Sequence, residues 1–263
     1  MWVVHSWAES EMSVPTDELI AYLATYLRIA EVPDEAGSRN GLQVEGGPAV
    51  GRIALAVDAS ERTIEEAAGW SADLLIVHHG LFWDGGVPLT GRRYRKVRRL
   101  IEGQVAVYSA HIPLDVHPEV GNNVVLARAL GLEVEGWFGD YRGIPLGVWG
   151  VTDLRREALA ARLDDVLGVR VRMMAGGPER LGRVGIITGG GGSMIGQAIG
   201  AGLDAYVTGE GAHHTYFDAV EGGINVYYGG HYATEVWGVR ALGEHLRERY
   251  GVEARFIDGP TGL

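Results

Sequence analysis

The stretch Leu74-Leu75-Ile76-Val77-His78-His79-Gly80 is an uninterrupted apolar run that ends in two histidines and a glycine. A short apolar run of this kind, rich in branched residues, is typical of a strand buried on both faces of a parallel sheet. Similar runs occur at 51–58 and 105–108. A helical pattern from 60 to 69 lies between the run at 51–58 and the run at 74–77. The alternation predicts mostly parallel strands with helices packed on the sheets.

The second half of the chain repeats this order. A shift of 131 positions places Gly51-Arg52-Ile53 on Gly182-Arg183-Val184, and it places Leu74–Val77 on 205–208. Because the predicted strands and helices also follow one another in the same order after this shift, the pattern indicates an internal duplication. We therefore predict an internally duplicated α/β fold with two similar halves.

We expect the first α/β repeat to span 13–131 and to hold the His78, His79 and Asp115 motifs. The second should span 144–263 and hold the His231 and Glu235 motif, with no large insert domain between the two. In open parallel sheets, ligands gather at the carboxyl ends of strands, and the histidine motifs lie at such ends.

Composition narrows the function. The 263 residues carry a formal charge of −11, which argues against nucleic-acid and anionic-membrane partners. There is no cysteine, so a metal would be bound by imidazole and carboxylate. Residues 1–12 lack the features of a signal peptide and no run is long enough to span a membrane, so we expect a cytoplasmic protein.

Three clusters carry candidate metal ligands. His78 and His79 follow a predicted strand, and Gly80 lets the chain curl so that both rings can bind neighbouring ions. Asp115 lies four residues after His111, where a loop carboxylate can bridge two cations; a turn cap is the alternative. His231 and Glu235 are one turn apart on a predicted helix, although Glu235 can equally serve the helix dipole.

Together these clusters favour a two-metal site. Histidines and carboxylates suit divalent ions such as Zn²⁺, Mn²⁺ or Fe²⁺. Two such ions can lower the pKa of a bound water and stabilise a developing oxyanion, which is hydrolytic chemistry. A non-enzymatic metal-binding regulatory or scaffold protein is the competing interpretation.

The order of the motifs resembles a known family. It is carried by Asn40-Gly41-Leu42-Gln43, His78-His79-Gly80, His111-x-x-Leu114-Asp115, Thr208-Gly209-Glu210 and Gly230-His231-x-x-x-Glu235. These motifs are similar to those of the GTP cyclohydrolase 1 type 2 homologue family, also called NGG-interacting-factor-three-like.

The resemblance implies two divalent ions per chain, held by His78, His79, Asp115, His231 and Glu235. It also implies a homohexamer and a GTP cyclohydrolase-like reaction on a nucleotide or other small phosphorylated substrate. We expect His111 or Glu210 to assist proton transfer; Glu210 can instead orient a ligand histidine. His213-His214 matches no motif and is not expected to bind metal.

Two further features allow alternative interpretations. The basic run from Arg92 to Arg99 is either a solvated helix face or a rim that attracts phosphate or nucleic acid. The run Gly189-Gly190-Gly191-Gly192-Ser193 lies between a strand and a helix, as phosphate-binding loops do, but it lacks their Lys-Ser/Thr ending, which favours a tight turn.

Overall fold

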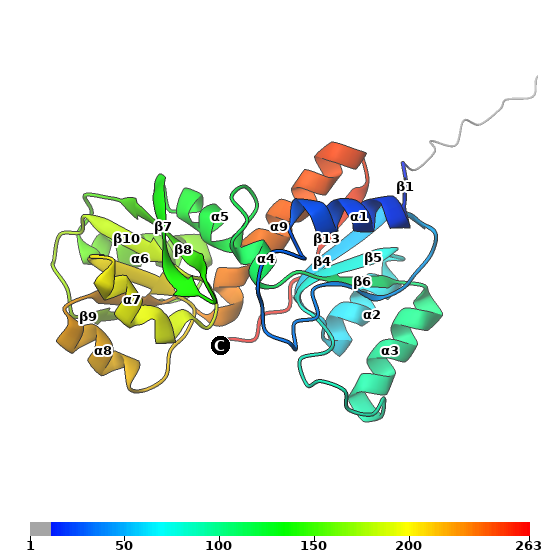
Figure 1. The fold of residues 1–263 in the computed structure, drawn as a ribbon, viewed down its shortest axis with the longest axis horizontal. Helices are drawn as coiled ribbons and strands as arrows, with labels where there is room; N and C mark the ends of the chain where they lie inside the picture. Colours follow the sequence, from blue (N-terminus) through cyan, green and yellow to red (C-terminus); the bar gives the residue numbers. More distant parts are fainter. Residues whose placement is uncertain (1–11) are drawn as a thin grey trace, which may run out of the picture.

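The computed structural model describes residues 12–263 and has two α/β lobes side by side (Figure 1). Residues 1–11, which include most of the segment used to argue against a signal peptide, lie outside the described residues. Within 12–263, none of the helices combines the length and the apolar character needed to cross a membrane.

The first lobe is built on a five-stranded sheet in the order β13-β4-β5-β6-β2. Its strands are β2 (Gly41–Val44), β4 (Arg52–Asp58), β5 (Leu74–His79), β6 (Ala106–Ser109) and β13 (Glu253–Phe256). Its helices are α1 (Thr16–Tyr26), α2 (Glu61–Gly69), α3 (Gly91–Gly103) and α4 (Ile112–Asp115). A short ribbon of β1 (Val14–Pro15) and β3 (Ala49–Val50) lies beside α1.

The second lobe has a six-stranded sheet in the order β7-β8-β10-β11-β12-β9. Its strands are β7 (Val134–Tyr141), β8 (Ile144–Val151), β9 (Arg172–Ala175), β10 (Arg183–Ile186), β11 (Ala205–Thr208) and β12 (Asn225–Tyr228). Its helices are α5 (Asn122–Ala129), α6 (Arg156–Leu167), the 3-10 turn η1 (Gly191–Met194), α7 (Ile195–Gly200) and α8 (Thr215–Gly222). The last helix, α9 (His231–Tyr250), begins at this lobe and packs on the first sheet.

The predicted duplication is confirmed by strand register. β4, β5 and β6 are parallel neighbours, and so are β10, β11 and β12. Ile53 pairs with Leu74 and Val184 pairs with Ala205, so the same shift of 131 relates both pairs. β2 and β9 each add an antiparallel strand at the corresponding edge.

One hydrogen-bonding pattern is repeated in full. Asp73 accepts from the backbone N–H groups of Gly51 and Arg52 at 2.8 Å each. In the second lobe, the Asp204 carboxylate accepts from the N–H groups of Gly182 and Arg183 at 2.7 and 2.9 Å. The carboxylate directly before β5 therefore binds the backbone at the start of β4, and the carboxylate directly before β11 does the same for β10.

The other edges of the two sheets differ. In the second lobe, β7 and β8 form an antiparallel hairpin, so this sheet is more mixed than the predicted one. Its two-residue turn consists of Arg142 and Gly143, with φ of 53° and 89°. Positive φ at both central residues gives the turn a twist that matches the twist of the paired strands.

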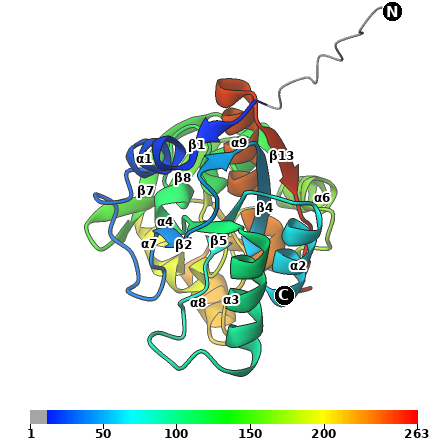
Figure 2. The same ribbon diagram turned by 90° about the vertical axis from the view of Figure 1, so that its right-hand side faces the viewer.

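The end of the chain returns to the first lobe. α9 leaves the second lobe and packs against α5 and β4, and β13 then pairs in parallel with β4 (Figure 2). Gly243 allows this approach, since a Cβ there would lie 2.3 Å from Leu55 Cδ1. The range expected for the second repeat, 144–263, thus contains a strand of the first sheet.

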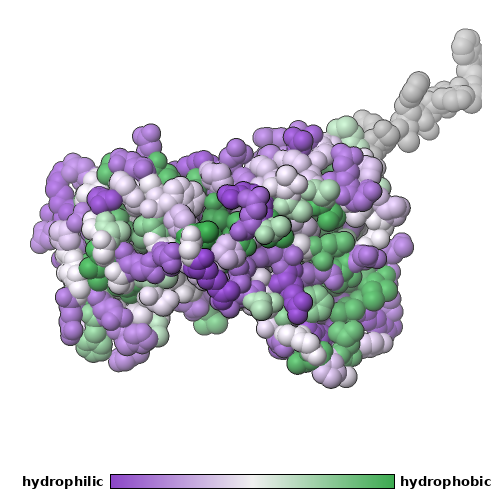
Figure 3. Space-filling model, viewed as in Figure 1, coloured by the Kyte–Doolittle hydropathy of each residue, from purple (hydrophilic) through white to green (hydrophobic). Residues whose placement is uncertain are grey.

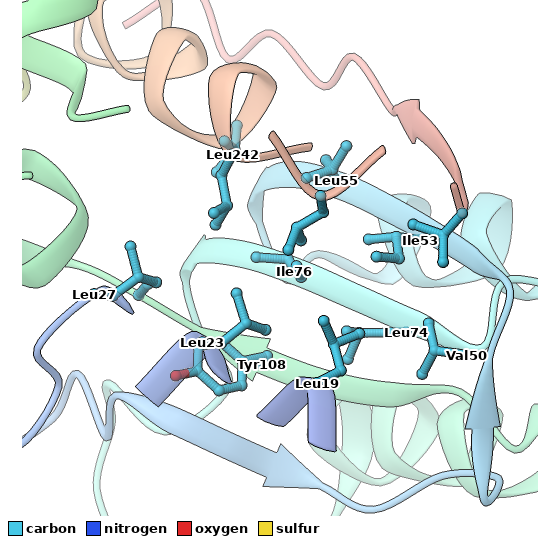
Figure 4. Packing of buried hydrophobic residues seen from close by; sticks show 14 of the residues in the cluster. Leu19, Leu23, Leu27, Val50, Ile53, Leu55, Leu74, Ile76, Tyr108 and Leu242 are labelled. Atoms are coloured by element: carbon cyan, nitrogen blue, oxygen red, sulfur yellow. The ribbon is translucent and has the colours of Figure 1, made fainter. Parts of the chain in front are cut away.

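The first sheet is covered on both faces, by α1 and α9 on one side and by α2 and α3 on the other. Leu19 and Leu23 of α1, and Leu27 directly after it, pack with Ile76 and Tyr108, and Leu242 enters from α9 (Figure 4). β4 and β5 are buried almost throughout, as the continuous apolar runs predict. These packed strands fix the position of the residues at their carboxyl ends.

We predict equal stability costs for removing the two repeated anchors. Asp73→Ala and Asp204→Ala should each lower the free energy of unfolding by about 2 kcal/mol, because each leaves two backbone N–H groups without their charged acceptor. Urea unfolding followed by tryptophan fluorescence measures the change, with exposed Glu65→Ala as the control. A loss in only one lobe would contradict the proposed structural equivalence.

Candidate metal centre

The candidate ligands converge where the two lobes meet. His78 and His79 end β5, Asp115 ends α4, and His231 and Glu235 lie in the first two turns of α9. Because α9 starts at the second lobe and crosses to the first, it brings Glu235 against the end of β5. The fold therefore joins residues that are more than 150 positions apart in the sequence.

Glu235 lies at the centre of this group. Its Oε1 is 3.5 Å from His78 Nε2, and its Oε2 is 3.4 Å from His79 Nε2 and 3.1 Å from His231 Nε2. Asp115 Oδ2 lies 3.7 Å from His78 Nε2. One carboxylate thus faces three imidazoles from both lobes, and a second faces one of them.

The two adjacent histidines turn their Nε2 atoms to the same side. Their ring centroids are 4.7 Å apart, with 49° between the ring planes. His78 Nδ1 donates to the Ala110 carbonyl oxygen at 2.9 Å, and His79 Nδ1 donates to Asp58 Oδ1 at 2.9 Å. Since both partners are acceptors, Nδ1 carries the hydrogen and Nε2 is left to face the centre.

The other two histidines follow the same rule. His111 Nδ1 donates to Asp34 Oδ1 at 2.8 Å, and His231 Nδ1 donates to Glu210 Oε1 at 2.7 Å. A hydrogen bond from the second ring nitrogen to a carboxylate or carbonyl is the usual support of a metal-binding histidine.

The ligand atoms form two overlapping groups. His78, His79 and His111 make one group that can hold a metal ion, and His79, His231 and Glu235 make the other. Within each group the ligand atoms lie within 4.8 Å of one another. His111, which we predicted as a proton carrier, therefore lies in a ligand position.

Unsatisfied atoms support the fit of a cation. His78 Nε2 and Glu235 Oε2 are buried and have no hydrogen-bond partner in the described part of the chain. A buried polar atom without a partner costs roughly 1–3 kcal/mol, so both atoms gain if a cation binds between them. Asp115 differs because its Oδ1 accepts from Asn122 Nδ2 at 2.8 Å, which leaves Oδ2 to face His78.

The pKa shifts of the clustered side chains also favour a bound cation. Burial opposes protonation of His78, but Asp115 and Glu235 outweigh it and raise the pKa of His78 to about 10. The Glu235 carboxylate, 3.1 Å from His231 Nε2, raises the pKa of His231 to about 9 despite burial. Burial raises the pKa of Asp115, whereas the histidines hold the pKa of Glu235 below its usual range against the effect of burial. The carboxylates thus attract positive charge to this site.

The glycine run closes one wall of the site as a tight turn. Gly189 has φ of 66°, and a Cβ there would lie 1.9 Å from Glu235 Oε1. The Gly189 N–H donates to Thr234 Oγ1, and its carbonyl oxygen accepts from Gly209 and Glu210. The positive φ and the close approach of the Glu235 carboxylate explain why glycine is needed at position 189.

Sequence reasoning missed the supporting carboxylates. Asp58 ends β4 and pairs in register with His79, and Asp34 holds both His111 and the backbone N–H of Ile112. Asp58 gave a usable signal, since it ends a predicted strand beside the His-bearing one. Asp34 lies in an irregular loop and gave none. His213 and His214 belong to neither ligand group within the described residues.

We predict that metal-free protein loses stability as pH rises from about 6.5 to 10. The pKa values of His78 and His231 are raised above the ordinary 6.5, so their protons stabilise the folded state below that pH. This contribution disappears as pH rises through about 9 and about 10. Urea unfolding at several pH values measures it. Glu235→Gln should flatten the dependence, and an unchanged slope in that variant would contradict the assignment.

Comparison with known proteins identifies the family. The family model for Duf34/NIF3 (NGG1p interacting factor 3) matches residues 14–261. A Deinococcus radiodurans protein named GTP cyclohydrolase 1 type 2 homolog is 44% identical over 249 residues, covering 94% of each chain. A protein of the same name from Halobacterium salinarum is also 44% identical, covering 90% of this chain and 95% of the relative.

Solved structures agree. The protein ybgI, titled as of unknown function, has a TM-score of 0.89 at 38% identity and covers 95% of this chain and all of its own. TTHA1606 from Thermus thermophilus has a TM-score of 0.87 at 40% identity, with 95% and 100% coverage. Reduced HcgD from Methanocaldococcus jannaschii has a TM-score of 0.82 at 26% identity, with 94% and 99% coverage. The chain is a member of the Duf34/NIF3 family.

Proposed function

We propose that this protein is a dinuclear metal-dependent hydrolase that acts on a nucleotide or other small phosphorylated molecule. The observation that carries the proposal is the convergence of Nε2 atoms and carboxylate oxygens around two overlapping ligand groups. His79 belongs to both groups and Glu235 faces histidines of both, so two neighbouring cations would share these ligands. Nitrogen and oxygen donors of this kind suit Zn²⁺, Mn²⁺ or Fe²⁺.

The ligands we assign are His78, His79, His111, Asp115, His231 and Glu235. Two divalent ions held here would supply an activated water and positive charge for a developing oxyanion. The chain itself orients the ligands: each of the four histidines has its Nδ1 atom held by an acceptor. Such preorganisation leaves little freedom to be lost when substrate binds.

Glu210 is the proton-transfer group that this geometry favours. Its side chain is half exposed, and it lines a cavity of about 220 Å³ together with His79 and His231. One of its oxygens accepts from His231 Nδ1, so the carboxylate is positioned beside the ligands and open to the cavity. His111 is better used as a ligand than as a proton carrier.

The names of the relatives point to a particular hydrolytic reaction. Several relatives at 40–44% identity are named GTP cyclohydrolase 1 type 2 homolog, which suggests ring opening of a purine nucleotide. The competing function, a metal-binding regulatory or scaffold protein, requires the same ligands but no turnover. A screen of metal-loaded protein against nucleotides and phosphoesters separates the two.

We also propose that the chain assembles with copies of itself, as a hexamer. Exposed apolar side chains cluster where α3 and the loop before it protrude, at the lower right of Figure 3. They include Val87, Leu89, Tyr94 and Ile101, and α8 exposes Tyr216 and Phe217 at the equivalent place in the other lobe. Contiguous apolar surface of this kind is typical of an interface.

The assembly proposal predicts a mass well above that of one 28.3 kDa chain by light scattering at micromolar concentration. Ile101→Glu, which places a charge in the apolar patch, should shift the protein toward smaller species. Exposed Glu102→Lys, on the same turn of α3, serves as a control for charge change alone. A monomeric mass for the unmodified protein would refute the proposal.

The ligand assignment predicts metal loss on substitution. Glu235→Gln and His78→Ala should each reduce bound metal well below two ions per chain and abolish hydrolysis, because each removes a central ligand. Elemental analysis after identical metal loading measures the first effect, and circular dichroism confirms the fold. His213→Ala, at a histidine outside both groups, should retain full metal content.

Metal content tests the ligand assignment, and turnover tests the hydrolytic mechanism. Two ions retained in Glu235→Gln would refute the ligand set. Metal loss with unchanged turnover would keep the site and overturn the metallohydrolase mechanism.

A further inference from the structure

A second cavity adjoins the candidate metal centre on the side of the first lobe. It has a volume of about 340 Å³ and is lined by His79 and its partner Asp58, together with Ser60, Trp83, Lys96 and Tyr232. It shares Asp58, His79 and Tyr232 with the 220 Å³ cavity that reaches Glu210 and His231. The residues that line the two cavities therefore extend from Lys96 past His79 to His231 and Glu210.

The Lys96 ammonium group is fixed by one hydrogen bond and keeps N–H donors for a ligand. The ammonium donates to the Ala59 carbonyl oxygen at 2.6 Å, and the Ala59 N–H in turn donates to the His79 carbonyl oxygen at 2.9 Å. An ammonium has three N–H donors, so two remain for another acceptor. The backbone of Ala59 thus fixes Lys96 relative to a metal ligand.

The carboxylates near Lys96 have other partners. Glu61 is paired with Arg95 at 2.7 Å, and Asp84 is paired with Arg93 at 3.0 Å. Asp58 accepts from His79. Within residues 12–263, none of the ion pairs involves Lys96, although its side chain is half-buried. Burial and the neighbouring Arg92 accordingly lower the pKa of Lys96.

Lys96 is also the one lysine or arginine among the described residues that line the cavities beside the cluster. Neither the 220 Å³ cavity nor a third cavity of about 250 Å³, on the side of the glycine run, is lined by a lysine or arginine among the described residues. An anionic substrate entering these cavities, in a protein of charge −11, therefore meets one lysine and no arginine among the described lining residues. That cation marks one end of the site.

We propose that the Lys96 cavity is the subsite that binds the phosphate group of the substrate. The inference rests on the proposed hydrolase function, because it assigns a place for one end of that substrate while the other end lies beside His79 and His231. A phosphate oxygen accepts from the two remaining Lys96 N–H donors. Trp83 and Tyr232 leave the rest of the cavity suited to an apolar or planar part of the molecule.

The chain allows a direct test because Lys96 is its only lysine. Labelling with ¹³Cε-lysine leaves the ammonium and its three N–H donors unmodified and gives one lysine side-chain signal by NMR. Titrating inorganic phosphate into the metal-loaded protein should shift that signal in a saturable way, while chloride at equal ionic strength should not. Lys96→Arg identifies the signal, because the variant contains no lysine and lacks it.

A kinetic readout completes the test with the phosphorylated substrate found in the screen. Lys96→Gln should raise KM about tenfold or more with a smaller change in kcat, as expected for loss of a charge-assisted contact far from the reacting bond. Lys96→Arg should recover much of the affinity because it restores the charge. Arg99→Gln, on the same helix but outside the cavity, is the matched control.

The outcomes are distinguishable from those of the proposed function. Turnover with unchanged KM in Lys96→Gln, or a lysine signal that ignores phosphate, overturns the subsite. A saturable phosphate shift without any turnover in the screen supports the subsite and overturns the hydrolase.

Discussion

Glu235 is a carboxylate with only 3% of its surface exposed, surrounded by imidazoles from both lobes. A buried charge is costly unless other charges compensate it. Here compensation comes from His78, His79 and His231, and the raised pKa of His78 indicates that a proton takes this role when no metal does. The position of α9, which carries Glu235, therefore depends on the ends of strands in both sheets.

This constraint explains how the lobes are connected. α9 must begin at β12, where His231 can reach the centre, and must then pack on β4 so that Glu235 meets β5. Gly238 and Gly243 allow the approach, since a Cβ at Gly238 would lie 2.8 Å from Asn122 Oδ1. Asn122 in turn holds Asp115, so helix packing and ligand position are linked through one side chain.

The sequence predicted the halves and the converging motifs because these depend on local pattern. Buried strands, the helix that carries His231 and Glu235, and the shift of 131 are all visible without the fold. The pairing of β13 with β4 in the first sheet was not predictable, because the sequence of a four-residue edge strand does not indicate which strand it pairs with. Asp34 was missed for a related reason: only the fold brings this loop residue to His111, 77 positions away.

The duplication also explains why the centre is asymmetric. His111 and His231 occupy equivalent positions after β6 and β12, and each donates Nδ1 to a carboxylate. The position equivalent to His78, however, is Gly209, where a Cβ would lie 2.8 Å from the Cα of His231. A second histidine pair there would displace the start of α9 and with it Glu235. The second lobe therefore keeps glycine at this position and contributes Glu210 as the partner of His231, so that one lobe supplies the histidine pair and the other supplies the helix that completes the site.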